Sequence, residues 1–395
     1  SEKHYRQARA WTVGSFMDFT YTEIQTMLAD SVGKFIDNEY DFDTRQAYAG
    51  SDKGYSEEVW STFAELGWTA VPFSEEDGGF GGGPTDVMVL MQSLAPGLVV
   101  EPYLANVIRA GGILRRAASP DQKERWLQAI IGGELQATLA FNEPQARYDL
   151  ASVHTTATAD GDDWVLNGTK GLVPNGGTAD LLIVPARTAG ASVDEDGITL
   201  FAIDAKAAGV SCNAYATVDG LRAAEITLDG VRAGADAVIG EVGKGFAALD
   251  ATIDDATLAV CAEAVGIMYV LKDKTVEYSK NRKQFGVPIG SFQELQHRMV
   301  DMLMACEQAQ SLLMWSVMKR DAEGDDCKRA VSSIKYLIGT EGKKLGEDAV
   351  QIHGGMGVTW DLDVAHYFKR LTAINTLFGN ADWHLDKLAD TAPQT

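Results

Sequence analysis

The hydrophobic periodicity of the chain changes twice, and these two changes constrain the fold more than any other feature. From about Tyr21 to Gly133, apolar residues recur every three or four positions, as in Val32, Phe35 and Ile36, which predicts helices. From 136 to 240 the chain has short runs rich in Val, Ile, Leu and Thr, separated by Gly or Asp-Gly, which predicts strands. From 243 onward the helical spacing returns. The sequence therefore predicts an α+β protein with a β-domain between two helical regions.

These changes of period also predict the domain boundaries. Residues 1–16 differ from the rest and precede Met17, a natural start, so they are a possible leader. We expect an N-terminal helical domain over 17–135, a compact β-barrel or sandwich over 136–241, and a C-terminal bundle over 242–395. The predicted strands are 137–141, 152–159, 164–166, 181–184, 198–203 and 224–228. The bundle is predicted to contain four long helices, at about 244–281, 292–321, 328–352 and 370–389.

Composition limits the partners and the compartment. The formal net charge of −22 argues against binding to nucleic acid or to an anionic membrane, so local cations must hold any anionic ligand. The four cysteines lie far apart and the six histidines form no metal-ligand cluster, so we expect reduced thiols and no metal site. No stretch approaches 18 consecutive apolar residues, and the sequence is typical of a cytoplasmic protein.

A bend is predicted between the first two bundle helices, from Arg282 to Gln296. Pro288 lacks an N–H and biases Val287 away from helix, while Arg282 and Lys283 place two cations at the bend. Such a bend can present charge to a phosphate-bearing ligand. A plain turn with two solvated cations remains the alternative on spacing alone.

Two motifs in this part of the chain resemble signatures of the acyl-CoA dehydrogenase family. The first is Arg282-Lys-Gln-Phe-Gly-Val-Pro-Ile, followed by Phe292-Gln-Glu-Leu-Gln, and the second is Gln351-Ile-His-Gly-Gly-Met-Gly-Val-Thr. The resemblance implies α,β-desaturation of an acyl-CoA thioester. FAD takes the hydride in that reaction, and a carboxylate removes the α-proton.

That carboxylate is missing from both positions where the family places it. The resemblance aligns Gly379 with one position and Ala256 with the other. Asp254 and Asp255 are close in sequence, but one residue along a helix rotates a side chain by about 100°, so we expect exposed acids on the helix face. Glu263 is expected at the bundle surface or at the edge of its core.

The flavin-ring motifs are also altered. The family pattern Thr-Glu-Pro-x-Ala-Gly-Ser-Asp is here Asn142-Glu-Pro-Gln-Ala-Arg-Tyr-Asp, so Arg147 and Tyr148 replace Gly and Ser. In the next motif, Leu172 and Pro174 stand where the family has Trp and Thr. Leu cannot stack on the ring as Trp does, and Pro has neither a hydroxyl nor an N–H. The resemblance thus implies that this chain's own ring site is degraded.

The residues that would serve a neighbouring subunit's FAD are retained. Family members share each FAD across an interface, so Arg282 would pair with the pyrophosphate, Phe285 would pack near the adenine, and glycines would permit close backbone approach. His353 either donates to the cofactor or is a packed turn residue. The predicted FAD-binding residues are Arg282, Gln284, Phe285, Phe292, Gln293, Gln351, His353, Gly354 and Gly355.

We therefore expect a non-catalytic subunit of a heteromeric acyl-CoA dehydrogenase, with two copies joined to two of a homologous catalytic subunit that supplies the base. Runs 262–266 and 366–372 resemble the small or β subunits of such enzymes, which act on pimeloyl-CoA or steroid side chains. An electron-transferring flavoprotein is the expected electron acceptor. The alternatives are a self-sufficient homo-oligomeric dehydrogenase with Asp254 or Asp255 as base, a flavin monooxygenase, and a structural paralogue without FAD.

Overall fold

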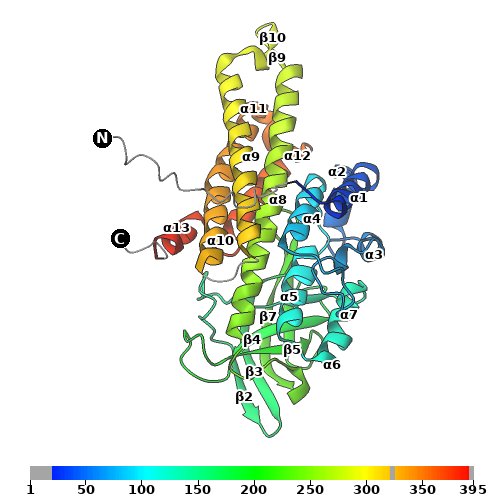
Figure 1. Cartoon of the computed structure of the whole chain (residues 1–395), viewed down its shortest axis with the longest axis vertical. Helices are drawn as coiled ribbons and strands as arrows, with labels where there is room; N and C mark the ends of the chain where they lie inside the picture. Colours follow the sequence, from blue (N-terminus) through cyan, green and yellow to red (C-terminus); the bar gives the residue numbers. More distant parts are fainter. Residues whose placement is uncertain (1–19, 321–324, 391–395) are drawn as a thin grey trace, which may run out of the picture.

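The computed structural model describes residues 20–320 and 325–390 of the chain. The possible leader at 1–16 lies outside these residues. Figure 1 shows an elongated molecule in which the long bundle helices run along the main axis, with the β-sheet at one end and the β9–β10 hairpin at the other. The N-terminal helices lie along one side, against the bundle and the sheet. The α+β architecture expected from the sequence is confirmed.

Short helices with clear caps form the N-terminal region. Ser56 accepts a hydrogen bond from the backbone N–H of Val59 and caps α3, as its sequence position predicts. The helices are α1 (Glu23–Glu39), α2 (Phe42–Gly50), α3 (Glu57–Glu65), α4 (Pro84–Leu94), the π-helical η3 (Leu104–Ala110) leading into α5 (Gly111–Ala117), and a run of α6 (Pro120–Gln122), π-helical η4 (Lys123–Leu127) and α7 (Gln128–Ile131). α2 was not predicted as a separate helix from the sequence.

The middle region is one connected eight-stranded sheet with the order β6-β7-β3-β2-β4-β5-β8, and β1 pairs with β4. Its strands are β1 (Ala137–Leu139), β2 (Thr156–Asp160), β3 (Asp163–Pro174), β4 (Leu181–Arg187), β5 (Ile198–Asp204), β6 (Val210–Ala216), β7 (Arg222–Ala233) and β8 (Val238–Ile239). β3 and β7 are much longer than predicted, and β6 was missed because most of its side chains are exposed and its apolar alternation is weak. A register shift between Lys170 and Val173 interrupts the β3–β7 pairing, and Leu172 there has a φ of 46°.

The C-terminal bundle is built around α8 (Phe246–Asn281), which packs against α4, α9 and α11. Gly266 allows the close approach of α4, because a Cβ there would lie 2.7 Å from the carbonyl oxygen of Gln92. The other elements are β9 (Lys283–Gln284), β10 (Val287–Pro288), α9 (Gln293–Arg320), α10 (Asp325–Leu337), π-helical η7 (Ile338–Gly342), α11 (Lys343–His353), 3₁₀-helical η8 (Gly354–Val358), α12 (Asp363–Thr376) and α13 (Ala381–Asp390).

The predicted fourth bundle helix, 370–389, is wrong in detail. It is two helices, α12 and α13, separated by Leu377–Asn380, where Phe378 and Gly379 have φ values of 57° and 112°. These left-handed conformations end α12 and turn the chain. No helix in the described ranges combines the length and the apolar character needed to cross a bilayer. Within the same ranges, no three His, Cys, Asp or Glu side chains gather as a metal site.

Candidate functional site

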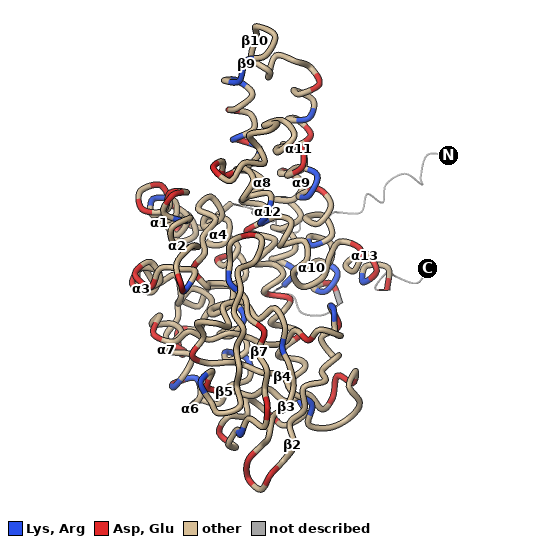
Figure 2. Tube along the Cα trace, turned by 180° about the vertical axis from the view of Figure 1, so that it is seen from behind, with Lys and Arg blue, Asp and Glu red and all other residues tan. Residues whose placement is uncertain are grey.

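The β9–β10 hairpin between α8 and α9 forms the exposed tip of the bundle (Figure 1). Val287 pairs with Gln284, and the N–H of Ile289 donates to the carbonyl of Arg282 at 2.8 Å, which closes the turn. Phe285, with a φ of 53°, is 93% exposed, and its ring lies edge-on to that of Phe292 with centroids 6.2 Å apart. Figure 2 shows a basic segment beside β9. The tip thus presents an unburied aromatic ring and positive charge.

A hollow of about 680 Å³ lies between this tip and the end of α11. The fold brings eight of the nine predicted FAD-binding residues to its lining: Arg282, Gln284, Phe285, Phe292, Gln351, His353, Gly354 and Gly355. Gln293 begins α9 as an exposed residue and is absent from that lining. Residues some 70 positions apart in the sequence therefore meet around one open hollow.

The hollow is suited to an anionic group that approaches the backbone closely. A Cβ added to Gly354 or Gly355 would meet nothing within 4 Å, so both glycines face open space. Gly354 also has a φ of 61°, which favours glycine. Arg282 has no carboxylate partner among the described residues, whereas Arg298, which also lines the hollow, pairs with Glu294. A free guanidinium beside an open glycine backbone fits a pyrophosphate.

His353 is held by its own helix and by an aromatic ring. Its ring stacks on Tyr278 with centroids 4.3 Å apart, and its Nδ1 lies 2.8 Å from the carbonyl of Ala349. Since a carbonyl accepts, Nδ1 carries the proton. Burial lowers the pKa of His353 and favours the neutral form, so Nε2 is an acceptor. The geometry favours the packed turn residue over a donor to a cofactor.

The position aligned with the family's base is closed at Gly379. A Cβ there would lie 2.5 Å from Cε3 of Trp383 and 2.7 Å from Nε2 of His384, and the φ of 112° disfavours any side chain. The Nζ of Lys335 donates to the carbonyl of Gly379 at 2.6 Å and fixes the turn. The other aligned position, Ala256, is fully buried in α8. A carboxylate cannot occupy Gly379 without displacing α13.

Asp254 and Asp255 are not the exposed helix-face acids that the sequence analysis expected. The Asp255 side chain is 15% exposed and pairs with Arg115, Arg116 and Arg320. Asp254, 14% exposed, pairs with Lys328 at 2.6 Å. The expectation failed because the partners come from α5, α9 and α10, far away in the sequence.

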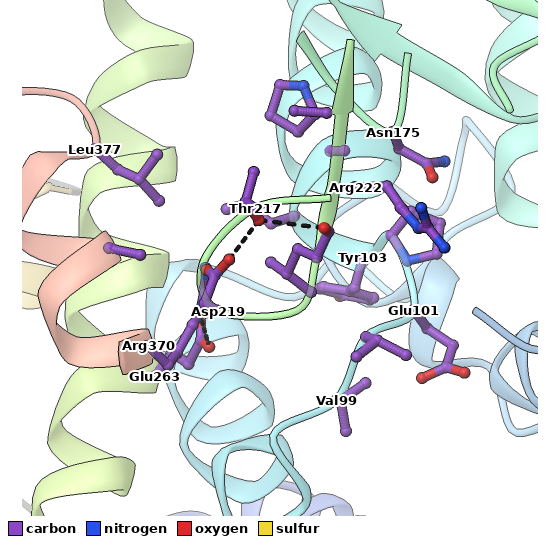
Figure 3. Close-up of a pocket in the computed structure, with 18 of the residues that line it drawn as sticks. Val99, Glu101, Tyr103, Asn175, Thr217, Asp219, Arg222, Glu263, Arg370 and Leu377 are labelled. Carbon is purple, nitrogen blue, oxygen red and sulfur yellow. Dashed lines mark hydrogen bonds and ion pairs between the residues drawn. The ribbon is translucent and has the colours of Figure 1, made fainter. Parts of the chain in front are cut away.

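Glu263 also points inward. Its two carboxylate oxygens accept from Nε and Nη2 of Arg370 at 2.6 and 2.7 Å, and Nη1 of Arg370 donates to Asp219 at 2.8 Å. This group lines a cavity of about 310 Å³ (Figure 3). Both oxygens of Glu263 are therefore engaged.

The region of the altered flavin-ring motifs holds a second cavity, of about 380 Å³. Leu172 and Pro174 line it and supply no hydroxyl, and the ring of Tyr148 lies edge-on to Trp383 with centroids 6.0 Å apart. The Glu143 carboxylate is bound to the buried Nζ of Lys170 at 2.6 Å. Glu143, one of the retained motif residues, is thereby part of the β-domain core, and Leu172 and Pro174 offer neither the stacking ring nor the hydroxyl that the family motif supplies.

Arg109, on η3, lines both cavities and was not among the residues predicted from the sequence. It is 2% exposed, and its guanidinium lies 5.1 Å from the ring centroid of Phe141 and 5.7 Å from that of Phe378. One sequence signal was present: Arg109 is a lone cation in the otherwise uncharged run from Tyr103 to Leu114.

Comparison with known proteins defines the class. Three family models match consecutive parts of the chain: the acyl-CoA dehydrogenase N-terminal domain over 22–134, the middle domain over 138–231 and the C-terminal domain over 243–392. The probable acyl-CoA dehydrogenase fadE25 of Mycobacterium leprae is 30% identical over 321 residues, covering 80% of this chain and 82% of that protein. The chain belongs to the FAD-binding acyl-CoA dehydrogenase family.

Two solved structures refine the comparison. The FAD complex of PigA is 26% identical with a TM-score of 0.88, covering 95% of this chain and 98% of that one. The ChsE4-ChsE5 complex from Mycobacterium tuberculosis contains a chain that is 25% identical with a TM-score of 0.87, covering 96% of this chain and 100% of that one. The fold is thus shared with an FAD-bound protein and with a complex of two named subunits.

Proposed function

We propose that this chain is a non-catalytic subunit of a heteromeric acyl-CoA dehydrogenase that desaturates an acyl-CoA thioester. FAD would accept the hydride, and a homologous partner subunit would provide the base and the flavin-ring site. This chain would hold the ADP half of that FAD at its tip, with Arg282 on the pyrophosphate and Gly354 and Gly355 against it. Two copies would assemble with two partner subunits, and an electron-transferring flavoprotein would accept the electrons.

The observation that carries the proposal is the contrast between the position of the base at Gly379 and the hollow at Gly354 and Gly355. The backbone at Gly379 leaves no space for a carboxylate, because Trp383 and His384 fill it. The hollow at Gly354 and Gly355 is open and has a free cation beside it. A chain that has no space for the base but has an open hollow for the cofactor is suited to contribute only one half of an FAD site, the other half coming from a second subunit.

The structure argues against the self-sufficient dehydrogenase. Neither Asp254 nor Asp255 lines the 310 Å³ or the 380 Å³ cavity. Burial by itself raises the pKa of Asp255, but the surrounding guanidiniums outweigh it and lower the pKa below its usual range. A carboxylate held ionised by three arginines is a poor proton acceptor.

The flavin content of the purified protein tests the proposal. We expect little flavin in the chain expressed alone, and one FAD for each pair of unlike subunits when it is expressed with a homologue that has the missing Glu, Trp and Thr. In that complex, Arg282→Ala should lower the flavin content, because the pyrophosphate loses its guanidinium. Lys283→Ala is the matched control: it removes a neighbouring charge that does not line the hollow.

The outcomes are distinct. Full FAD occupancy in the chain expressed alone would refute the half-site. An equal loss of flavin in Arg282→Ala and Lys283→Ala would mean that general positive charge at the tip, and not a specific contact, holds the cofactor.

A further inference from the structure

The two sides of the hollow at the tip of the bundle come from different elements. Arg282 directly follows α8, whereas Gly354 and Gly355 follow α11, much later in the sequence. A guanidinium and a glycine backbone hold one anionic group well only if their separation is fixed in advance. α11 packs along α8 (Figure 1), so contacts between the ends of these two helices set that separation.

Tyr278, in the last turn of α8, contacts both sides. Its hydroxyl donates to the carbonyl of His353 at 3.3 Å, and its ring stacks on the His353 ring with centroids 4.3 Å apart. Its own backbone carbonyl accepts from the N–H of Arg282 at 2.8 Å, the bond at which α8 ends. One residue of the hollow's lining therefore joins the backbone that precedes the glycines to the backbone of the cation.

The bond to His353 acts directly on the glycine backbone. The carbonyl of His353 and the N–H of Gly354 belong to one planar peptide group, so a bond that fixes one also orients the other. That N–H donates to the carbonyl of Gln351. The segment then folds back closely on α11, since a Cβ on Gly357 would lie 2.6 Å from the carbonyl oxygen of Val350. The first peptide of this segment is thus held from α8 by the Tyr278 hydroxyl.

The other end of the same segment is also attached to α8. Nζ of Lys274 lies 2.7 Å from a carboxylate oxygen of Asp363, the first residue of α12. Lys274, Tyr278 and Arg282 follow one another at intervals of four residues, a spacing that places them on one face of a helix. This face of α8 therefore holds the segment between α11 and α12 at both of its ends, and Tyr278 is the contact beside the glycines.

We propose that Tyr278 is a positioning residue of the hollow, which fixes the backbone of Gly354 and Gly355 relative to Arg282. The inference rests on the proposed role of the hollow in holding the ADP half of FAD, and it adds a residue outside the nine predicted from the sequence. The ring of Tyr278 packs on His353, but only its hydroxyl bonds the carbonyl next to Gly354. The hydroxyl is therefore the group that sets the position of the glycines.

Tyr278→Phe separates the hydroxyl from the ring, because it keeps the stack on His353 and removes the bond to the carbonyl. Hydrogen exchange followed by mass spectrometry, on the chain expressed alone, measures the effect on the backbone. We expect exchange in peptides that cover 354–358 to become about fivefold faster, since one hydrogen bond that restrains local opening is lost. The melting temperature should fall by less than about 3 °C, because packing is retained.

The consequence for the cofactor is measured in the complex with the homologous partner. There, Tyr278→Phe should raise the Kd for FAD by about fivefold, because the glycine backbone is no longer held in place before binding. Tyr269→Phe is the matched control: Tyr269 also lies on α8, and its hydroxyl donates at 3.0 Å to Glu307, which does not line the hollow. This variant should change neither the exchange of 354–358 nor the Kd for FAD.

Three outcomes would each overturn the positioning role: unchanged exchange in Tyr278→Phe, faster exchange without weaker FAD binding, or the same changes in Tyr269→Phe. Failure of the half-site is seen elsewhere, in full FAD occupancy of the chain expressed alone, and the exchange measurement requires no cofactor. A complex that loses flavin with Arg282→Ala but keeps its Kd for FAD with Tyr278→Phe would retain the half-site and refute the role of Tyr278.

Discussion

Asp255, on α8, joins three arginines from two other helices. Arg115 and Arg116 extend from α5, and Nε of Arg320 reaches from α9 to an Asp255 oxygen at 2.6 Å. The carboxylate is 15% exposed, so it is mostly removed from water. Asp255→Asn keeps the shape of the side chain but removes its charge. The three guanidiniums then lie close together without a carboxylate between them.

The expected cost follows from the burial of the group. Breaking a buried pair by removing one partner typically costs about 3 to 5 kcal/mol. Arg115 and Arg116 are 31% and 20% exposed, so water screens part of the remaining repulsion. We therefore expect Asp255→Asn to lower the free energy of unfolding by about 3 kcal/mol.

Urea denaturation followed by helical circular dichroism measures this, and its pH dependence adds a second check. The pKa of Asp255 is lowered in the folded state, so its contribution is present above the unfolded value of about 3.9 and is lost as the pH falls through the folded value. The difference between the wild type and Asp255→Asn should be constant from about pH 8 to 5 and should shrink below about pH 4.

Asp254→Asn is the matched control on the next residue. Asp254 pairs with Lys328, which retains Asp250 as a second partner, and burial raises the pKa of Asp254. Loss of the Asp254 charge should therefore change stability by no more than about 1 kcal/mol. Equal losses in the two variants, or a loss in Asp255→Asn that stays constant down to pH 3, would refute the account of the three-arginine cluster.

Two further predictions concern the closed site and the core of the β-domain. Gly379→Glu should destabilise the chain by about 2 kcal/mol or more without creating dehydrogenase activity, because its Cβ meets Trp383 in a backbone conformation that disfavours side chains. Thermal unfolding measures the loss of stability, and an acyl-CoA dye-reduction assay measures the activity. A stable, active variant would contradict the prediction. Lys170→Met should cost about 3 kcal/mol or more at neutral pH, because it leaves Glu143 buried without its ammonium partner. Burial by itself raises the pKa of Glu143, but Lys170 outweighs this effect and holds the pKa at about 2. The free energy of unfolding of the wild type should therefore exceed that of Lys170→Met above about pH 4.5, and the difference should fall between about pH 4 and 2. A difference that does not depend on pH in urea denaturation would argue against the pair.

Local patterns in the sequence were sufficient for the architecture. Helical spacing such as Val32, Phe35 and Ile36 predicts a buried face, and these three residues are buried in α1. Ser56 caps α3 through the backbone N–H of Val59, three residues on, and capping of this kind depends only on neighbouring backbone groups. The motif residues Arg282 and Gln351 were recognisable from the sequence, since their spacing recurs in the family.

Tertiary structure decided which charges are free and which positions are closed. Asp255 follows a helical spacing that indicates exposure, yet Arg115 and Arg116, about 140 residues earlier in the chain, bury it. The sequence showed that Gly379 stands where the family has a carboxylate. Whether a side chain could fit at that position depends on how Trp383, on α13, packs against the turn. The burial of Arg109 between the rings of Phe141 and Phe378 likewise depends on segments that are distant in the sequence. Periodicity and capping act over a few residues and can be deduced from local sequence, whereas burial and pairing of charge depend on contacts between distant segments that only the folded chain brings together.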